Sequence, residues 1–156
     1  MKVKDVMNKR VITCTPSDVI SDVTRKLRRH NISGMPVVKR GEVVGIISES
    51  DVLGLLRTPE YSDELWLPSP LELIEVPIRE LVEWTKTKKA LEKIGSKPVA
   101  RVMKHHVHTI SPEESIEKAS EMMTKHHVNR LPVVKGDKLV GIITRGDIIT
   151  GLGGRI

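Results

Sequence analysis

The chain has 156 residues, a hydrophobic content of 38% and a formal net charge of +6 at pH 7. Its single cysteine, Cys14, excludes an internal disulfide and is typical of a protein from a reducing compartment. No apolar run reaches the roughly 18 residues of a membrane span, and the N-terminus lacks a signal-peptide core, so we expect a soluble, cytoplasmic protein without a membrane partner.

The sequence contains an internal repeat at an offset of 96 residues. Residues 3–53 align with residues 99–149 without a gap, and 17 of these 51 positions are identical. One copy is too small to bury both sides of its own sheet, and two copies are too few for a solenoid or a propeller. We therefore expect two similar halves, residues 1–57 and 99–156, which pack together, and an insert over residues 58–98.

The first predicted elements of each copy are a short strand and a helix. In the first copy, Val11–Cys14 is rich in residues that favour strands. Thr15, Pro16 and Asp18 are typical of a helix start, and apolar residues at helical spacing continue the helix as far as Leu27. The second copy repeats these signals at the same offset.

Two further strands and a short helix complete each copy. Apolar runs flank a glycine-containing turn at Met35–Val38 and Val43–Ile47, and again at Leu131–Val134 and Leu139–Ile143. We predict an α/β fold of two tandem repeats, each in the order β-α-β-β-α, packed with pseudo-twofold symmetry. The insert has prolines in its first half and a helical pattern that ends near Gly95, so we expect it to be partly helical.

A hydroxyl residue followed by an aspartate closes the last strand of each copy. The pairs are Ser48 with Asp51 and Thr144 with Asp147. This spacing is that of a capping box, which satisfies free amides at a helix start. The same groups could also bind a nucleoside phosphate. A carboxylate accepts hydrogen bonds from both ribose hydroxyls, and the helix start donates to phosphate.

Taken together, the motifs resemble those of CBS domains, and the pair resembles the CBS-pair (Bateman) module of small stand-alone archaeal and bacterial proteins. The resemblance covers about two-thirds of the chain. It rests on Val6-Met7, Val11-x-Thr13, Met35-Pro-Val-Val38 and Gly45-Ile-Ile-Ser-x-x-Asp51 in the first copy, and on Val102-Met103, Val107-x-Thr109, Leu131-Pro-Val-Val134 and Gly141-Ile-Ile-Thr-x-x-Asp147 in the second.

The resemblance implies a regulatory module without catalytic activity. Such a module binds AMP, ADP, ATP or S-adenosylmethionine between paired repeats, and it signals to an effector protein. Members of the family usually pair into flat dimers, so we expect a homodimer.

The resemblance also implies two ligand sites, each made of the aspartate motif of one repeat and of the first strand and pre-proline segment of the other. The first site would contain Ile46, Ser48, Asp51, His108, Thr109, Val128, Asn129, Arg130 and Pro132. The second site would contain Ile142, Thr144, Asp147, Ile12, Thr13, Ile32, Ser33, Gly34 and Pro36, with Arg145 as a further member. In both sites the aspartate would hold ribose, and the hydroxyl would support ribose or phosphate.

The two sites differ in charge. Arg130 offers a planar fork for phosphate in the first site, whereas its counterpart in the second site is Gly34. Arg145 could serve the second site, but its own counterpart is Glu49, a poor neighbour for an anion. We therefore expect unequal affinities, unless Arg130 is an ordinary surface arginine.

Three other functions were weighed. An enzyme is disfavoured because the sequence has neither a Gly-x-Gly-x-x-Gly fingerprint nor a phosphate-binding loop. A metal site is disfavoured because no cysteine or nearby carboxylate completes a ligand set with the histidines at 105, 106, 108, 126 and 127. Nucleic-acid binding is the main alternative, since lysines and arginines cluster at residues 25–29 and 86–93. Few aromatic residues, however, are present to stack on nucleobases.

Overall fold

The computed structural model describes residues 1–57 and 78–154 of the chain. These residues form two compact units. Unit 1 contains residues 1–16, 35–46 and 104–156, and unit 2 contains residues 17–34 and 47–103. Each unit therefore takes segments from both sequence repeats.

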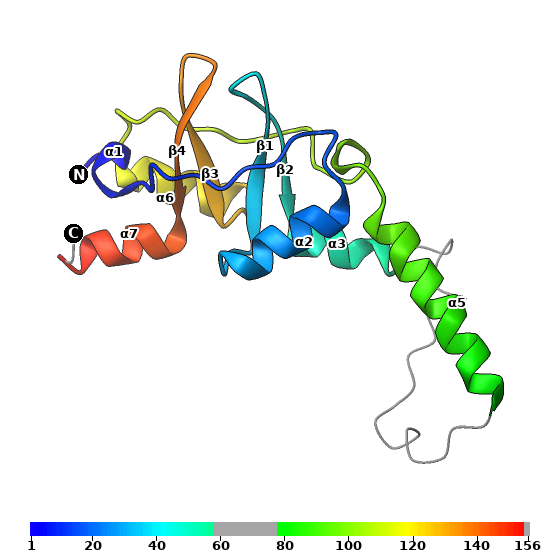
Figure 1. Cartoon of the computed structure of the whole chain (residues 1–156). Coiled ribbons are helices and arrows are strands. Elements are labelled where there is room, and N and C mark those ends of the chain that lie inside the picture. The colour runs from blue at the N-terminus through cyan, green and yellow to red at the C-terminus, as the bar shows by residue number, and fades with distance from the viewer. Residues whose placement is uncertain (58–77, 155–156) are drawn as a thin grey trace. The chain divides into compact units, whose positions relative to one another are not determined.

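Unit 1 is built on antiparallel strands with helices beside them (Figure 1). The strand order is β1-β2-β4-β3, and both β2 and β3 run antiparallel to β4. All four strands were predicted from the alternation of apolar runs and turns, and the α/β fold is confirmed. The strands are β1 (Gly34–Lys39), β2 (Glu42–Ser48), β3 (Arg130–Lys135) and β4 (Lys138–Thr144), and the helices of unit 1 are α1 (Val3–Val6), α6 (Ile116–Lys125) and α7 (Arg145–Leu152).

The core of unit 1 lies between β3, β4 and the helices. Helix α6 packs on β3 and on α7, and it buries Ile116, Ala119 and Met123, which recur at helical spacing. Burying one large aliphatic side chain contributes roughly 1.5–3 kcal/mol. The core cluster consists of Val3, Ile110, Ala119, Met123, Leu131, Val133, Ile143 and Ile148.

Unit 2 is mainly helical. Helix α2 contacts both α3 and α5, and its buried residues are Ile20, Val23 and Leu27. Helix α5 ends at Gly95, in the part of the insert that was expected to be helical, and buries Ala90 and Ile94. Residues 58–77 of the insert lie outside the described residues. The elements of unit 2 are α2 (Ile20–Arg29), α3 (Glu49–Leu55), α5 (Ile78–Gly95) and the short helix η2 (Val99–Arg101).

The first predicted strand of each copy is reduced to one bridged residue. Cys14 pairs in parallel with Val37, and Ile110 pairs in parallel with Val133. In each copy the bridge joins one residue of the first segment to the strand. The first segment of each copy still runs beside a strand, as predicted, but it is not itself a regular strand.

The predicted helix start near Thr15 is wrong, because α2 begins later, at Ile20. Val19 is held in an extended conformation by an antiparallel bridge to Pro98. Val99 N–H donates to the Asp18 carbonyl at 2.8 Å, and this pairing keeps the preceding residues out of the helix. The capping signals therefore mark a turn before the helix.

The same bridge occurs at the corresponding helix start of the second repeat. Lys2 pairs with Ser115, and both residues lie 96 positions from the partners in the Pro98–Val19 bridge. The segment before each repeat thus pairs with the other repeat. Near the Lys2–Ser115 bridge, Lys2 and Lys4 also donate to the exposed Glu113. Their hydrogen bonds lower the pKa of Glu113 to about 2.

The packing of α1 on α7 predicts that Gly151→Ala destabilises the protein. A Cβ atom at Gly151 would lie 2.7 Å from Cγ1 of Val6, whose branched side chain has few alternative rotamers. We expect a loss of about 1–3 kcal/mol in the free energy of unfolding, measured by urea titration. Gly54→Ala in α3 is the matched control. Its Cβ would meet nothing within 4 Å, so the change should stabilise by up to about 1 kcal/mol. Equal effects of the two changes would contradict this account.

Candidate functional site

The predicted ligand-binding residues are distributed over both compact units. Those of the first site in unit 1 are Ile46, His108, Thr109, Val128, Asn129, Arg130 and Pro132, and those in unit 2 are Ser48 and Asp51. Those of the second site in unit 1 are Ile12, Thr13, Pro36, Ile142, Thr144, Arg145 and Asp147, and those in unit 2 are Ile32, Ser33 and Gly34.

The aspartate motif of unit 1 is held by its own helix start. Asp147 Oδ2 accepts hydrogen bonds from the Thr144 amide at 2.8 Å and from the Thr144 hydroxyl at 2.7 Å. The Thr144 hydroxyl accepts from the Asp147 amide at 3.3 Å, which completes a capping box. Within residues 1–57 and 78–154, the hydrogen bonds that Asp147 accepts all end on Oδ2. Oδ1 is therefore the oxygen that can accept from a ligand.

The aspartate motif of unit 2 repeats this geometry. Asp51 Oδ2 accepts from the Ser48 amide at 2.9 Å and from the Ser48 hydroxyl at 3.0 Å. Both aspartates are half-buried, and both stand in the first turn of a short helix. The predicted capping boxes are confirmed in both copies. Their oxygens lie at helix N-termini, where backbone amides attract anions.

The pre-proline segments begin where the preceding helices end in left-handed turns. Asn31 and His127 have positive φ angles of 51° and 53°, at equivalent positions after α2 and α6. The next residue in each copy donates back into the helix, as Val128 does to Met123 at 3.0 Å. This is the Schellman ending, formed here without glycine. It turns the chain sharply and delivers residues 32–34 and 128–130 to the starts of β1 and β3.

Hydrogen bonds link each pre-proline segment to the aspartate helix of the same repeat. Arg145 N–H donates to the Asn129 carbonyl at 3.2 Å in unit 1, and Glu49 N–H donates to the Ser33 carbonyl at 3.0 Å in unit 2. In unit 1, Ile110 N–H also donates to Pro132 at 3.1 Å. The first segment, the pre-proline segment and the aspartate motif of the second repeat are thus one hydrogen-bonded assembly.

A group of three histidines lies in the same unit. The rings of His106 and His108 meet edge to face with centroids 4.8 Å apart, and those of His108 and His126 stack with centroids 3.7 Å apart. Burial lowers the pKa of His108, and the charges of His126 and His106 lower it further. In the described part of the chain, no cluster of three or more histidines, cysteines or carboxylates has an arrangement that could hold a metal ion.

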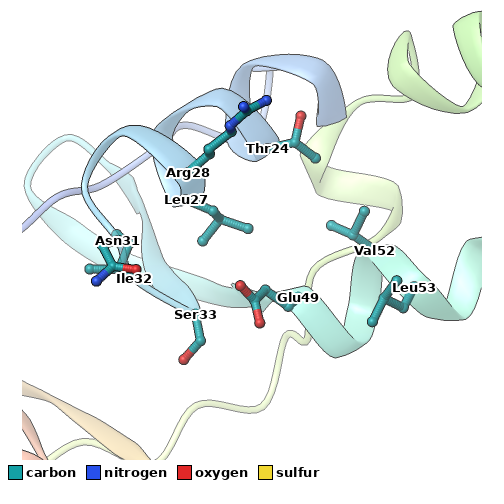
Figure 2. A pocket seen from close by; sticks show the side chains of 9 residues that line it. All are labelled: Thr24, Leu27, Arg28, Asn31, Ile32, Ser33, Glu49, Val52 and Leu53. Carbon is teal, nitrogen blue, oxygen red and sulfur yellow. The ribbon is translucent and has the colours of Figure 1, made fainter.

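A pocket of about 600 Å³ lies in unit 2, between α2 and α3. It includes Ile32 and Ser33, two residues of the predicted second site, and Figure 2 shows the Glu49 carboxylate directed into it. The guanidinium of Arg28 lies at the rim beside Thr24 (Figure 2). Glu49, which follows Ser48 of the first site in the chain, therefore shares a pocket with two residues of the second site.

Sequence reasoning missed most of the pocket's lining. Its signal was present as two helical stripes, one at residues 24, 27, 28 and 31 and one at residues 49, 52 and 53. Such stripes are indistinguishable from core faces until the contact between α2 and α3 is known. The missed residues are Thr24, Leu27, Arg28, Asn31, Val52 and Leu53.

Among the helices within residues 1–57 and 78–154, none combines the length and apolar character needed to cross a bilayer.

Comparison with known proteins identifies the repeat unit. The family model of the CBS domain matches residues 3–58 and again residues 99–154. A protein of Methanocaldococcus jannaschii, MJ1426, is 40% identical over 154 residues, which are 97% of this chain and 91% of that protein.

Two solved structures share the fold. MJ1225 of Methanocaldococcus jannaschii superposes with a TM-score of 0.78 at 24% identity, over 97% of this chain and 47% of that one. The CBS-domain pair of protein MJ0100, solved with 5′-methylthioadenosine and S-adenosyl-L-methionine, superposes with a TM-score of 0.67 at 25% identity, over 100% of this chain and 98% of that one. With two complete matches to the family model and a relative at 40% identity along nearly its whole length, the chain belongs to the CBS-domain family as a CBS-domain pair.

Proposed function

We propose that this CBS pair is a regulatory module that binds an adenosine ligand and signals to an effector protein without catalysing a reaction. The observation that carries the proposal is the doubled aspartate motif. In unit 1, Oδ2 of Asp147 holds the helix start, and Oδ1 remains able to accept from a ligand. A carboxylate fixed in this way is suited to the two hydroxyls of a ribose, since it only accepts hydrogen bonds when ionised.

The surroundings of the motif support a nucleoside rather than a bare anion. Ile142 is half-buried on β4 just before the motif, and the equivalent Ile46 is half-buried on β2. Apolar side chains of this kind can cover a purine, while the helix amides and hydroxyls donate to phosphate. The MJ0100 structure supports the same ligand class, because its two ligands share an adenosine group.

The two sites should differ in affinity for phosphate. Arg130 of the first site is half-buried at the start of β3, and its Nη1 atom lies in the interior. A guanidinium that is partly fixed by packing loses less freedom when it binds a phosphate. The second site has Gly34 at the equivalent position. Its own cation, Arg145, is exposed at the start of α7, and its residues Ile32 and Ser33 share a pocket with Glu49. We propose that the first site binds AMP, ADP or ATP more tightly, and that the second site favours a ligand with less negative charge, such as S-adenosylmethionine.

We propose a homodimer as the signalling form. Equivalent helices of the two repeats expose large apolar side chains at equivalent positions. Leu53 of α3 is 58% exposed and Ile149 of α7 is 69% exposed, and these residues lie 96 positions apart. Leu56 and Leu152 form a second such pair, at 36% and 68% exposure. Exposed apolar surface repeated by internal symmetry suits a self-complementary interface with a second copy of the chain.

A second candidate function, nucleic-acid binding, is favoured by one observation in unit 2. Helices α2 and α5 are in contact, and both carry exposed basic side chains. Part of this charge is neutralised within α2, where Arg25 pairs with Asp22 at 3.2 Å. The exposed basic residues outside that pair include Arg28, Arg29, Lys88, Lys89 and Lys93.

Replacing each aspartate by glutamate separates ligand binding from helix capping. A hydroxyl followed by glutamate at this spacing is itself a capping box, so Asp51→Glu and Asp147→Glu should keep their melting temperatures. The longer side chain moves the carboxylate away from the ribose. We expect each change to raise the Kd for adenosine ligands at its own site by at least about tenfold, which is about 1.4 kcal/mol, measured by calorimetry with AMP.

The two glutamate variants also test the inequality of the sites. Asp51→Glu should remove the tighter AMP-binding event, and Asp147→Glu should remove the weaker one. Asp137→Glu, in the exposed turn between β3 and β4, is the control and should change neither event. Identical losses in the two site variants would contradict unequal sites. Unchanged AMP binding in both would contradict the role given to the aspartates.

Charging the paired apolar positions should break the homodimer. Leu53→Lys combined with Ile149→Lys places two charges per chain in the proposed interface, where they would be desolvated. We expect light scattering to report a mass that falls from twice 17.5 kDa to 17.5 kDa. Leu91→Lys is the control, since Leu91 is 45% exposed on α5 and lies outside the repeat. A dimer that persists in the double variant would rule out this interface.

Salt dependence discriminates the nucleic-acid alternative. Contacts from lysine and arginine to phosphates release counterions, so the affinity for a duplex RNA or DNA should fall steeply between 50 and 200 mM salt, by a factor of roughly 10³–10⁵ for six to ten phosphate contacts. Fluorescence anisotropy with a labelled duplex measures this fall. Arg28→Gln with Lys89→Gln should reduce the slope. Retention of the full slope, or no binding at 50 mM salt, counts against a nucleic-acid partner.

A further inference from the structure

The histidine group of unit 1 connects two segments that approach the predicted phosphate-binding residues. His108 precedes Ile110, whose backbone pairs with β3, and His126 is the residue that ends α6. Their rings stack with planes 17° apart. Arg130 lies four residues after His126 and is the first residue of β3. The stacked pair therefore joins the end of α6, four residues before Arg130, to the first segment, which is bridged to β3 at Val133.

This arrangement fits a proton better than a metal ion. Stacked imidazoles direct their ring nitrogens side by side, so their lone pairs do not converge on one ion as tetrahedral coordination requires. Protonation needs no such convergence. His126 stands at a helix C-terminus, where a positive charge is favoured. Burial and the neighbouring charges of His126 and His106 lower the pKa of His108, so without a ligand His108 is mainly neutral near pH 7.

We propose that His108 and His126 make the first site selective for ligands that carry a phosphate, by taking up a proton as such a ligand binds. The inference rests on the proposed adenosine-binding function. A phosphate placed beside Arg130 supplies the negative charge that favours the imidazolium form, and the imidazolium in turn attracts the phosphate. Adenosine has no such charge and gains nothing from the pair.

The charges around the stacked pair are consistent with this role. His106 lies on the same segment as His108, and Arg130 begins the strand beside that segment. Lys125 and His127 flank His126 in the chain. The charges of His126 and His106 act on His108, so an anion is the partner that relieves this repulsion.

The first repeat provides an internal comparison. The residues equivalent to His106, His108 and His126 are Arg10, Ile12 and His30. Since Ile12 has no titratable group, a stacked pair of imidazoles cannot form there. Proton-linked selectivity is therefore a property of the first site alone.

NMR titration of the histidines in the full native chain tests the proposal. We expect the pKa of His108 to lie below 6.5 in the free protein, to rise by about one unit or more with saturating AMP, and to stay unchanged with adenosine. One unit corresponds to at most a tenfold gain in AMP affinity from this group, reached between a pH above and a pH below both of its pKa values. In the absence of ligand, a fall in pH has the opposite effect on folding stability. Because folding lowers the pKa of His108, the free energy of unfolding decreases as the pH falls below 6.5.

Variants separate the protein's titration from that of the AMP phosphate. His108→Ile introduces the first-repeat residue, and calorimetry between pH 7.5 and 5.5 should then report only the pH dependence of AMP itself. His105→Asn, an exposed histidine outside the stacked group, should behave as the native chain does. Since the NMR titration uses native protein, it decides the question even if His108→Ile is unstable.

The outcomes distinguish this inference from the proposed function. If AMP and adenosine both bind but the pKa of His108 does not move with AMP, the proton-linked selectivity is wrong and the adenosine-binding function stands. If neither ligand binds at millimolar concentration, the proposed function fails and this inference fails with it. Equal pKa shifts with AMP and adenosine would also overturn it, because they would reflect packing rather than charge.

Discussion

In each repeat, one carboxylate oxygen organises the junction between the last strand and the last helix. Oδ2 of the motif aspartate accepts from both the amide and the hydroxyl of the residue that closes the strand. This pair of bonds fixes where the strand stops and the helix begins, and it sets the orientation of the carboxylate. An aspartate free to rotate would lose side-chain entropy on meeting a ligand. Here folding has already fixed that side chain, so the geometry that stabilises the helix would also prepare the acceptor that the proposed ribose contact requires.

How much of this could be predicted depends on the range of the interaction involved. The four strands and the capping boxes arise from residues within a few positions of one another, and both were predicted. The start of α2 was not, because Val19 pairs with Pro98, a residue 79 positions away. No local signal reports such a pairing, and the capping pattern at Thr15 was locally sound. The stacking of His108 on His126 likewise depends on α6, which returns the chain to the first segment.

The duplicated bridges explain why the compact units do not follow the repeats. Each repeat is preceded by a short segment that pairs with the helix start of the other repeat, at Lys2–Ser115 and at Pro98–Val19. A unit of about 50 residues buries too little apolar surface to be stable alone. Because the repeats exchange these segments, the fold of each repeat is stabilised by pairing with a segment that precedes the other. The cost is loop closure between distant residues, which rises only slowly with chain length.

Duplication also allows the repeats to differ where the fold does not require them to agree. The identical positions include the prolines, the glycines before the motif and the motif aspartates, which all set backbone geometry. The differing positions carry charge: Arg130 replaces Gly34, Arg145 replaces Glu49 and His108 replaces Ile12. Each change makes the second repeat more basic in a segment assigned to a ligand. Since the scaffold is shared, these side chains can alter which ligand binds without altering the fold. Under the proposed function, the common part recognises the sugar and the diverged part recognises the phosphate, so such a module would compare two adenosine compounds of different charge.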